Sequence, residues 1–272
     1  MTAFNTITSA IFNVLMTPFG FGPAWFDLLL WPVLAGVIAL LVYKKVSNQK
    51  GIADAKRRMT VHLLEVVLYR EDVVGVVRST ALGMVQNLRY LGFNVVPMLV
   101  MIAPMTVVLV QLVSNYAYDP LQPGEVQLLE VALDPQSGLA STDVKASFPD
   151  GIVPEAGPVR TADGRVYWRL RMDGEGQHAI TLSAGSETQT KTVVVGGGHQ
   201  RVPVLRTQSW ESLLYPGEPA LASSSAFESI RVAAPDRDLG PFPSGESGIL
   251  LWFFGASLLA GFALKDPLGV TL

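Results

Sequence analysis

The sequence contains no cysteine, which excludes both a disulfide framework and a metal site built on thiolates. Charged residues are also scarce: Asp, Glu, Lys and Arg make up 16% of the chain, whereas hydrophobic residues make up 49%. With a mean hydropathy of +0.36, the chain is too apolar for an ordinary soluble protein. We therefore expect a membrane protein with a soluble part that is held together by its hydrophobic core alone.

Residues that commonly carry catalysis are few and scattered. His62, His178 and His199 fall on different predicted elements, and we expect a membrane to separate the first from the other two. Gly245–Gly248 has its serine displaced from the position of a nucleophile elbow. Gly196–Gly198 is predicted to form a hairpin turn, because no lysine-serine pair or helix follows it, as a phosphate-binding loop would require. We predict no enzyme activity, no metal site and no cofactor, and nothing indicates a glycosidase-type pair of carboxylates.

The longest apolar stretch predicts a membrane span over residues 92–115. No charged residue occurs between Phe93 and Val113, and about 20 apolar residues in a helix suffice to cross the hydrocarbon core. Pro97 and Pro104 lie inside this stretch, where each removes a backbone donor. A helix that contains them needs neighbouring helices to satisfy the freed carbonyl groups, so we expect this span to be packed against others.

One face of this span is expected to carry a stripe of Asn94, Met98, Met101 and Met105. A helical rotation of about 100° per residue brings the four side chains within about 60° of one another. Methionine side chains are unbranched and repack readily, so the stripe suits the wall of a groove that accepts many different apolar segments. The alternative is that the methionines fill gaps between packed helices.

Two further spans and an interfacial helix complete the predicted helical part. The first span covers residues 24–43 and ends at Lys44 and Lys45, which act as a stop-transfer pair. The last span, residues 249–264, is shorter than a typical hydrocarbon core requires. Residues 1–23, which precede the first span, are predicted to form a helix in the outer interface, with a signal peptide as the competing interpretation.

The uneven distribution of charge predicts the orientation. From Lys44 to Arg89 there are nine basic and four acidic residues, whereas from Asp119 to Glu246 the acidic residues outnumber the basic ones 17 to 10. By the positive-inside rule, we expect the first segment in the cytoplasm and the second outside. We expect a multi-pass protein of the bacterial inner membrane. In this orientation the N-terminus lies outside and the C-terminus lies in the cytoplasm.

Residues 44–91 are predicted to form a cytoplasmic helical hairpin, with a turn at Tyr69–Asp72 and Asp72 as N-cap of the second arm. The apolar stripes of the two arms are Ile52, Ala55, Met59, Leu63 and Val66, and Val73, Val77, Leu88 and Leu91. The cations expected to contact a partner are Lys50, Lys56, Arg57 and Arg58. Anionic lipid headgroups and ribosomal RNA are both open as partners, beside a purely topological role for the charge. We expect no DNA partner.

Beyond a linker at Asp119–Gly124, the pattern changes from a period of 3.6 to a period of 2. Short runs rich in strand-forming residues are separated by turn signals that contain glycine. The predicted strands are Val126–Leu133, Val144–Phe148, Val166–Arg171, His178–Leu182, Thr190–Val195, Val202–Arg206 and Ile230–Val232. Several short strands in roughly a hundred residues indicate an exported all-β, Ig-like sandwich over residues 120–238.

The predicted fold is an α-helical membrane protein with three transmembrane helices and a cytoplasmic helical hairpin, into which the exported sandwich is inserted. This order resembles the three-helix core of the YidC/Oxa superfamily of membrane insertases. The residues that carry the resemblance are Trp31–Lys45 running into Ser47–Lys50, the hairpin Ile52–Leu91, and Asn94–Gln111 with its Pro97-Met98 and Pro104-Met105 pairs. The resemblance covers about half of the chain, residues 3–115 and 249–265.

The resemblance implies that hydrophobic segments of nascent membrane proteins enter the bilayer through a cytoplasm-facing hydrophilic groove between the spans, with the hairpin receiving the substrate or the ribosome. Two features depart from the bacterial pattern. The first span, Leu28–Val42, has no arginine, the residue that makes the bacterial groove positive, and Arg89 is the candidate replacement. The sandwich also lies between the second and third core spans, whereas the bacterial insertase carries its large exported domain before the first.

Two functional hypotheses follow. In the first, the chain is an insertase-like or chaperone-like membrane protein whose groove is built from Asn94, Met98, Met101, Met105 and Arg89. Its partners would be the lipid bilayer and hydrophobic client segments, with the ribosome or other membrane-protein subunits as further candidates. In the second, it is a membrane-anchored binding or assembly subunit whose sandwich recognises a partner. A fold does not specify a function by itself, so the choice depends on the site.

Overall fold

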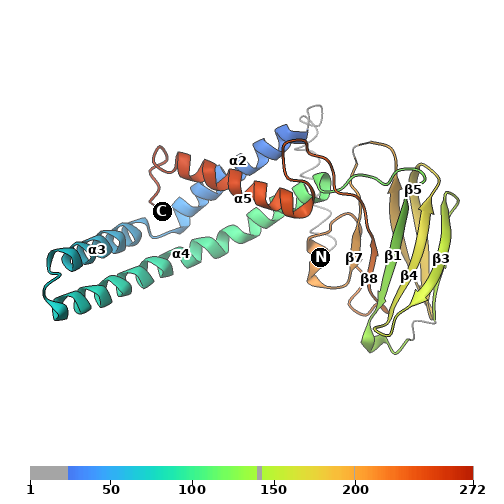
Figure 1. The fold of residues 1–272 in the computed structure, drawn as a ribbon, viewed down its shortest axis with the longest axis horizontal. Coiled ribbons are helices and arrows are strands. Elements are labelled where there is room, and N and C mark those ends of the chain that lie inside the picture. Colours follow the sequence, from blue (N-terminus) through green and yellow to red (C-terminus); the bar gives the residue numbers. More distant parts are fainter. Residues whose placement is uncertain (1–23, 140–142, 199, 272) are drawn as a thin grey trace. The chain divides into compact units, whose positions relative to one another are not determined.

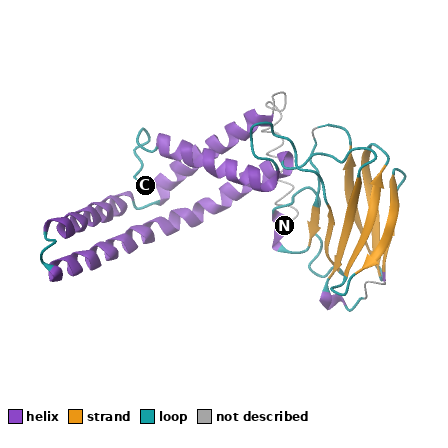
Figure 2. Cartoon of the chain, viewed as in Figure 1, coloured by secondary structure: helices purple, strands orange, loops and turns teal. Residues whose placement is uncertain are grey.

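The computed structural model describes residues 24–139, 143–198 and 200–271 (Figure 1). The interfacial helix predicted for residues 1–23 lies outside the described residues. All described strands follow helix α4 in the sequence and precede helix α5, so the β part is an insertion between two helices (Figure 2). This arrangement agrees with the predicted position of the sandwich.

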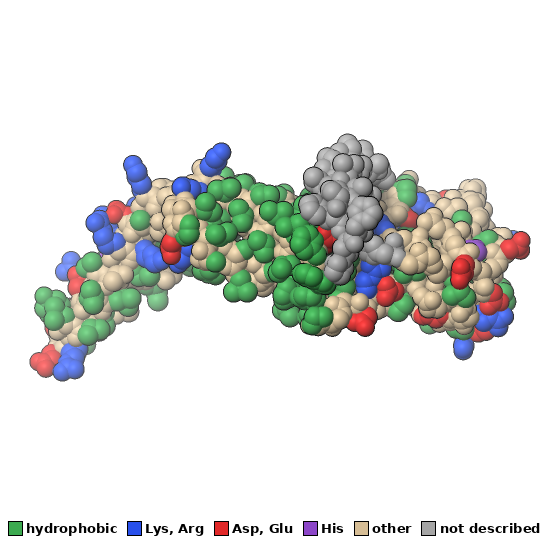
Figure 3. Space-filling model, turned by 90° about the horizontal axis from the view of Figure 1, so that it is seen from above, with side chains coloured by type: hydrophobic (Ala, Val, Ile, Leu, Met, Phe, Trp, Pro, Cys, Tyr) green, Lys and Arg blue, Asp and Glu red, His purple; other side chains and the backbone are tan. Residues whose placement is uncertain are grey.

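Three helices are long and apolar enough to cross a membrane: α2 (Ala24–Val46), α4 (Val73–Tyr116) and α5 (Gly245–Leu264). Hydrophobic side chains cover much of the helical part in the face shown in Figure 3. Helix α5 begins four residues before the predicted boundary at Ile249. Its 20 residues correspond to about 30 Å of helix, so it has the length of a typical hydrocarbon core.

The chain divides into two compact units, and each is described by itself. One contains residues 29–108 and 253–272, and the other contains residues 109–252 with the start of α2 up to Leu28. Helix α4 contributes residues to both. It joins the second arm of the hairpin and the predicted span in one uninterrupted helix of 44 residues. Pro97 is buried and Pro104 is exposed.

The hairpin has the predicted turn. Helix α3 (Gln49–Leu68) is capped by Asn48, whose Oδ1 accepts the Gly51 N–H at 2.9 Å. Asp72 caps α4, because its Oδ1 accepts the Val74 N–H at 3.1 Å. Helices α3 and the first part of α4 run side by side (Figure 1), which confirms the antiparallel pairing.

The contact between the two arms is more polar than predicted. Glu65 Oε2 accepts the hydroxyl of Ser79 at 2.9 Å and lies 2.9 Å from His62 Nδ1. Leu63, a member of the predicted apolar stripe of α3, is 60% exposed. Its neighbour His62 lies on the side of α3 that contacts α4. The apolar stripe of the second arm does not form a buried contact within the hairpin, because its residues are exposed: Val73, Val77, Leu88 and Leu91.

Helices α2 and α5 approach each other closely at one glycine. A Cβ on Gly36 would lie 2.5 Å from the backbone oxygen of Ser257, closer than atoms can come without displacing the backbone. Small residues at such contacts allow apolar helices to gain packing that larger side chains would prevent. Gly36 therefore sets the spacing of these two helices.

The β part consists of two antiparallel sheets with strand orders β3-β4-β1-β8-β7 and β2-β5-β6. The strands are β1 (Val126–Leu133), β2 (Val144–Ser147), β3 (Ile152–Arg160), β4 (Arg165–Met172), β5 (Gly176–Ala184), β6 (Glu187–Val195), β7 (Leu205–Thr207) and β8 (Phe227–Val232). Their inward side chains form one core, which includes Leu129, Trp168, Leu182 and Phe227. Every predicted strand corresponds to an observed one.

Strand β3 was not predicted, for a physical reason. It contains Pro154 and Pro158, and only Ile152 among its residues is buried, so it shows no alternation of apolar and polar residues. Proline cannot donate to a sheet, but it is accepted on an edge strand. Strand β3 lies at the edge of its sheet, paired only with β4.

The glycine run Gly196–Gly198 does not form the predicted hairpin turn. It follows β6, and the next strand, β7, belongs to the other sheet, so the run belongs to a connection between sheets. All three glycines have positive φ, between 66° and 81°, a conformation that glycine adopts at little cost.

The edge of β6 that does not pair with β5 makes polar contacts with residues outside the sheet. Lys191 is fully buried, and its ammonium group donates to Glu218 and to the carbonyl oxygen of Pro203. Glu218 also accepts the Thr192 N–H at 2.6 Å. Burial lowers the pKa of Lys191, while the adjacent Glu218 opposes that shift. The pair is satisfied by several hydrogen bonds, as a buried ion pair requires.

We expect Lys191→Met to destabilise the sandwich by about 3–5 kcal/mol, because it leaves the Glu218 carboxylate buried without its counter-charge. The double variant Lys191→Met/Glu218→Gln should be considerably more stable, since it removes both charges and keeps an acceptor for the Thr192 N–H. Urea unfolding of the full chain in detergent, followed by the fluorescence of Trp168 and the other tryptophans, measures both changes. A double variant that is no more stable than the single one would contradict this account.

Candidate functional site

The predicted groove marker Asn94 joins two helices. The hydroxyl of Tyr43, on α2, donates to Asn94 Oδ1, and Asn94 Nδ2 donates to the carbonyl oxygen of Tyr90 at 2.7 Å. Tyr43 is buried and Asn94 is half-buried. Both polar groups of the Asn94 side chain are therefore engaged, which holds α2 against α4 at this level.

An apolar cluster surrounds this contact. Its buried members are Leu40, Tyr43, Ile52 and Val270, and Tyr90, Phe93, Met101, Leu264 and Leu268 pack against them. Val270 and Leu268 come from the segment that follows α5. Lys44 Nζ donates to the carbonyl oxygen of Leu268 at 2.6 Å, and the Thr271 N–H donates to Gln49 Oε1 at 2.7 Å. This segment seals the cluster between α2 and the start of α3, and the sequence patterns did not predict it.

The four residues of the predicted stripe do not share one environment. Met101 packs on the apolar cluster and Met105 is half-buried, whereas Met98 is 59% exposed. The gap-filling interpretation therefore holds for Met101, whereas the groove interpretation stays a prediction for Met98. Met101 fills space between helices, and Met98 alone presents an accessible, adaptable surface beside Asn94.

The predicted cations of the hairpin all lie at the surface. Lys50, Lys56, Arg57 and Arg58 are exposed on α3, and Arg89 is exposed on α4. Asp54 reduces the local positive charge, since it lies 2.8 Å from Arg57 and 3.9 Å from Arg58. Exposed pairs of this kind contribute little to stability.

A second polar cluster lies where α2 begins and α4 ends. Asp27 is 2% exposed, and its Oδ2 accepts the hydroxyl of Tyr116 at 2.6 Å. Gln111 is equally buried, and its Oε1 accepts from the guanidinium of Arg201 at 3.0 Å. Arg201 comes from the loop between β6 and β7. An arginine of the sandwich thus reaches a polar group on the last turns of α4.

The two linkers of the sandwich run side by side next to this cluster. The Asp119 N–H donates to the carbonyl oxygen of Pro235 at 3.0 Å, and the Arg237 N–H donates to that of Ala117 at 2.9 Å. The Arg237 guanidinium also pairs with Asp119 at 2.6 Å. The chain therefore leaves the helices and returns to them at one place.

Two tyrosines from this region converge on Glu246, at the start of α5. The hydroxyl of Tyr118 donates to Glu246 Oε1 at 2.7 Å, and that of Tyr215 lies 3.4 Å from Oε2. Burial and then the nearby Glu246 carboxylate raise the pKa of Tyr118, and the same causes raise the pKa of Tyr215 to about 12. Both hydroxyls remain protonated donors at neutral pH.

Asp27, Gln111 and Arg201 were not predicted from the sequence to be functional. A signal for the first was present, because Asp27 is the one charged residue between Ala24 and Tyr43, and ionisable residues inside apolar helices usually have a function or a partner. No pattern could have found Arg201, because its contact with Gln111 joins residues 90 positions apart.

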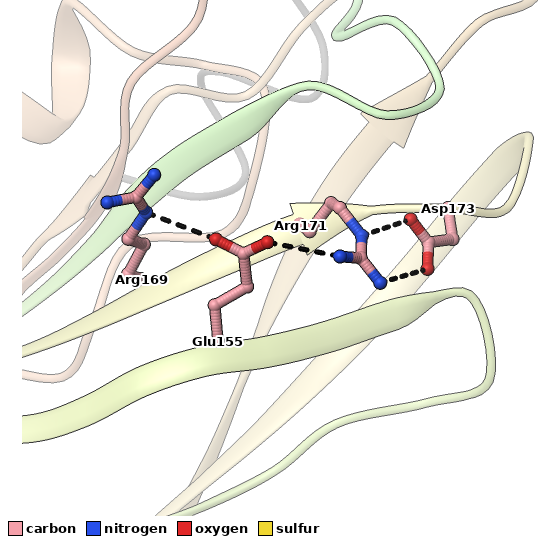
Figure 4. A network of polar contacts seen from close by, with 4 residues as sticks. All are labelled: Glu155, Arg169, Arg171 and Asp173. Atoms are coloured by element: carbon pink, nitrogen blue, oxygen red, sulfur yellow. Dashed lines mark hydrogen bonds and ion pairs between the residues drawn. The ribbon is translucent and has the colours of Figure 1, made fainter.

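Another candidate binding surface is the outer face of the five-stranded sheet, which carries charged side chains (Figure 4). Glu155 on β3 lies between Arg169 and Arg171 of β4, at 3.1 Å from each, and Arg171 also pairs with Asp173 at 2.8 Å. The hydrogen bond from Arg171 lowers the pKa of Asp173. Alternate residues of β4 point to the same face, so its arginines form a row.

Among the residues that the structure describes, no group of three or more His, Cys, Asp and Glu side chains could hold a metal ion. His62 contacts Glu65, and His178 Nε2 lies 2.8 Å from the carbonyl oxygen of Gly174. His199 lies outside the described residues.

No family model and no curated protein matches the chain. Among solved structures, domains 4 and 5 of the S-layer protein SbsC are similar at 14% identity and a TM-score of 0.24, over 30% of this chain and 49% of that one. SbsC domains 5–6 give 16% and 0.26, over 44% and 59%. The cysteine protease inhibitor EhICP2 from Entamoeba histolytica gives 13% and 0.23, over 30% and 88%. The chain spans about half the length of the first of these structures, and similarities this low support no functional conclusion.

We expect a double-mutant cycle of Tyr43→Phe and Asn94→Ala to give a coupling energy of about 0.6 kcal/mol, and at most about 1.7 kcal/mol, as for other hydrogen bonds between helices in membranes. The cycle is measured by unfolding of the full chain in detergent. Tyr69→Phe, at an exposed position, serves as the control and should show no coupling to Asn94→Ala. Additive effects of the Tyr43 and Asn94 substitutions would mean that their hydrogen bond does not hold the helices together.

Proposed function

We propose that this chain is a membrane protein that assists the insertion or folding of hydrophobic segments, similar to the YidC/Oxa superfamily. The observation that carries the proposal is the continuity of α4, which leads without a break from an exposed two-helix hairpin into a stretch apolar enough to cross a membrane. A client that contacts the hairpin is thereby offered a path along one continuous helix. The three apolar helices and the inserted β part support the same order of elements.

The proposed topology follows from charge. The hairpin with its excess of basic residues lies in the cytoplasm, together with the segment after α5, and the sandwich with its excess of acidic residues lies outside. Contacts between Lys44 and Leu268 and between Gln49 and Thr271 support a common side for the hairpin base and the segment after α5. The proposed membrane is the inner membrane of a bacterium.

In the proposed mechanism, a client segment contacts Met98, whose exposed and flexible side chain can adapt to different apolar surfaces. Asn94 contributes by positioning α2 against α4, because its polar groups are already bonded within the protein. The exposed cations Lys50, Lys56, Arg57 and Arg58 would attract anionic lipid headgroups or ribosomal RNA to the hairpin base. Arg89 adds positive charge further along the hairpin.

A photoreactive amino acid at position 98 should capture nascent membrane proteins in translating membranes, because Met98 is 59% exposed. The same group at position 101 should capture far less, since Met101 packs inside the apolar cluster. Position 259 on α5 is the control for mere exposure, as Leu259 is 73% exposed and is expected to face lipid. Equal capture from positions 98 and 259 would remove Met98 from the proposed path.

The second candidate function, recognition of a partner by the sandwich, is supported by the arginine row of β4. Arg169 is 59% exposed, and its guanidinium is held in place by Glu155, so the face is both accessible and preorganised. A partner with carboxylate or phosphate groups would suit such a row, because guanidinium groups bind these anions in a bidentate manner.

Excision of residues 122–234 separates the two functions. The linkers that remain are joined by the hydrogen bonds between Asp119 and Pro235 and between Ala117 and Arg237, so a short glycine-serine bridge can close the gap. The excision also removes Arg201, the partner of Gln111. We expect insertion of client segments to persist in reconstituted vesicles. Loss of activity on excision, together with loss on Arg169→Glu but not on the matched reversal Lys145→Glu, would favour recognition by the sandwich.

A further inference from the structure

Helix α4 carries an apolar seam that no described element covers. Between Val74 and Val95, apolar residues recur at alternating spacings of three and four. The seam consists of Val74, Val77, Ala81, Met84, Leu88, Leu91 and Val95. All seven are exposed, and the six large side chains among them are 50–79% exposed. Such a repeat over three heptads, without a charged residue in it, is the pattern of a coiled-coil seam.

The other arm of the hairpin does not use this seam. Helix α3 contacts a different face of α4, where Glu65 bonds to Ser79 and Met59 Sδ lies 3.6 Å from Asn87 Nδ2. The contact within the hairpin is thus small and partly polar, while the larger apolar side chains point outward. In a water-soluble hairpin the reverse distribution is expected, so the outward seam needs a cover.

The period of the seam indicates a supercoiled partner. A strict seven-residue repeat drifts by about 20° per heptad around a straight helix, and two helices compensate by winding around each other with a left-handed twist. On α4 the repeat continues at Met98 and Ile102, which are 59% and 57% exposed, and then at Met105, which is half-buried, and Leu112, which is fully buried. The exposed part of the repeat therefore extends past Val95 to Ile102.

We propose that the occupant is a second copy of this chain, paired through α4 in parallel and in register. Under the proposed topology, two copies in one membrane point the same way, so their α4 helices are parallel about a two-fold axis. One set of seam positions is then Val74, Ala81, Leu88 and Val95, and the other is Val77, Met84 and Leu91. Two of the four residues of the first set are valine, and the second set contains Met84 and Leu91, a composition compatible with a two-stranded parallel coiled coil.

The length of the seam and the surrounding charge fit this occupant. From Val74 to Val95 the seam extends over about 32 Å, which is sufficient for a stable two-helix contact. Arg78, next to Val77, is a charged residue that flanks the seam. In the parallel pair, no cation of the other copy lies opposite Arg78. Lipid can cover the seam only where α4 enters the membrane. A transient client would leave the part before Leu91 uncovered between binding events.

The absence of cysteine makes a direct test possible, because every thiol is then introduced. In a parallel pair in register, each seam residue faces its own copy, so Val77→Cys, Met84→Cys and Leu88→Cys should each form a disulfide-linked dimer on mild oxidation of native membranes. Leu82→Cys, which is exposed but outside the seam, should remain monomeric. Equal labelling of all four variants by a soluble maleimide after denaturation controls for the amount of reactive thiol.

A second variant tests the free energy of the pair. Leu88→Asp should shift the chain in mild detergent from the mass of two 29.3 kDa chains to that of one, whereas Leu82→Asp should not. Absence of dimers at all three seam positions overturns the proposal, as do adducts with a different protein. Dimers that form only near Met84 and not at Val77 indicate an antiparallel pair and overturn the parallel register. None of these readouts requires client insertion, so they can fail independently of the proposed function.

Discussion

The backbone of α4 is the constraint on which the other contacts depend. A helix satisfies its own N–H and C=O groups, which is the condition for any chain segment that enters an apolar phase. Along its 44 residues, α4 receives Glu65 at Ser79, Tyr43 at Asn94, Arg201 at Gln111 and Asp27 at Tyr116. Each neighbouring segment is thus attached to α4 by a polar contact in a mostly apolar setting.

These polar contacts are specific, because any other arrangement of the helices would leave a buried polar group without a hydrogen-bond partner. A polar group buried among apolar side chains loses several kcal/mol unless it is hydrogen-bonded. Asp27 and Gln111 can therefore be tolerated in their helices only with partners at the right position, and Tyr116 and Arg201 provide these. Apolar packing alone would allow the helices to slide or rotate relative to one another, whereas directional hydrogen bonds fix their register.

Regular elements were predicted well and their faces less well. The limits of β1 agree residue by residue, and the turn at Tyr69–Asp72 was found because local sequence determines both. The outward direction of Val77 and Leu88 could not be found, since periodicity identifies an apolar face without saying what covers it. Asn94 was predicted to mark a groove, whereas the structure shows it bonded to Tyr43, which lies 51 positions away. Contacts of that kind depend on tertiary packing and leave no local signal.

The polar cover of β6 has a consequence for association. An edge strand normally offers unpaired N–H and C=O groups to any other strand. On β6, Glu218 accepts the Thr192 N–H, Arg206 donates to the Thr190 carbonyl at 2.6 Å, and the Leu121 N–H donates to the Val194 carbonyl at 3.1 Å. The longer edge strand of the small sheet is therefore protected against the addition of another strand, so association of the β part along β6 is disfavoured.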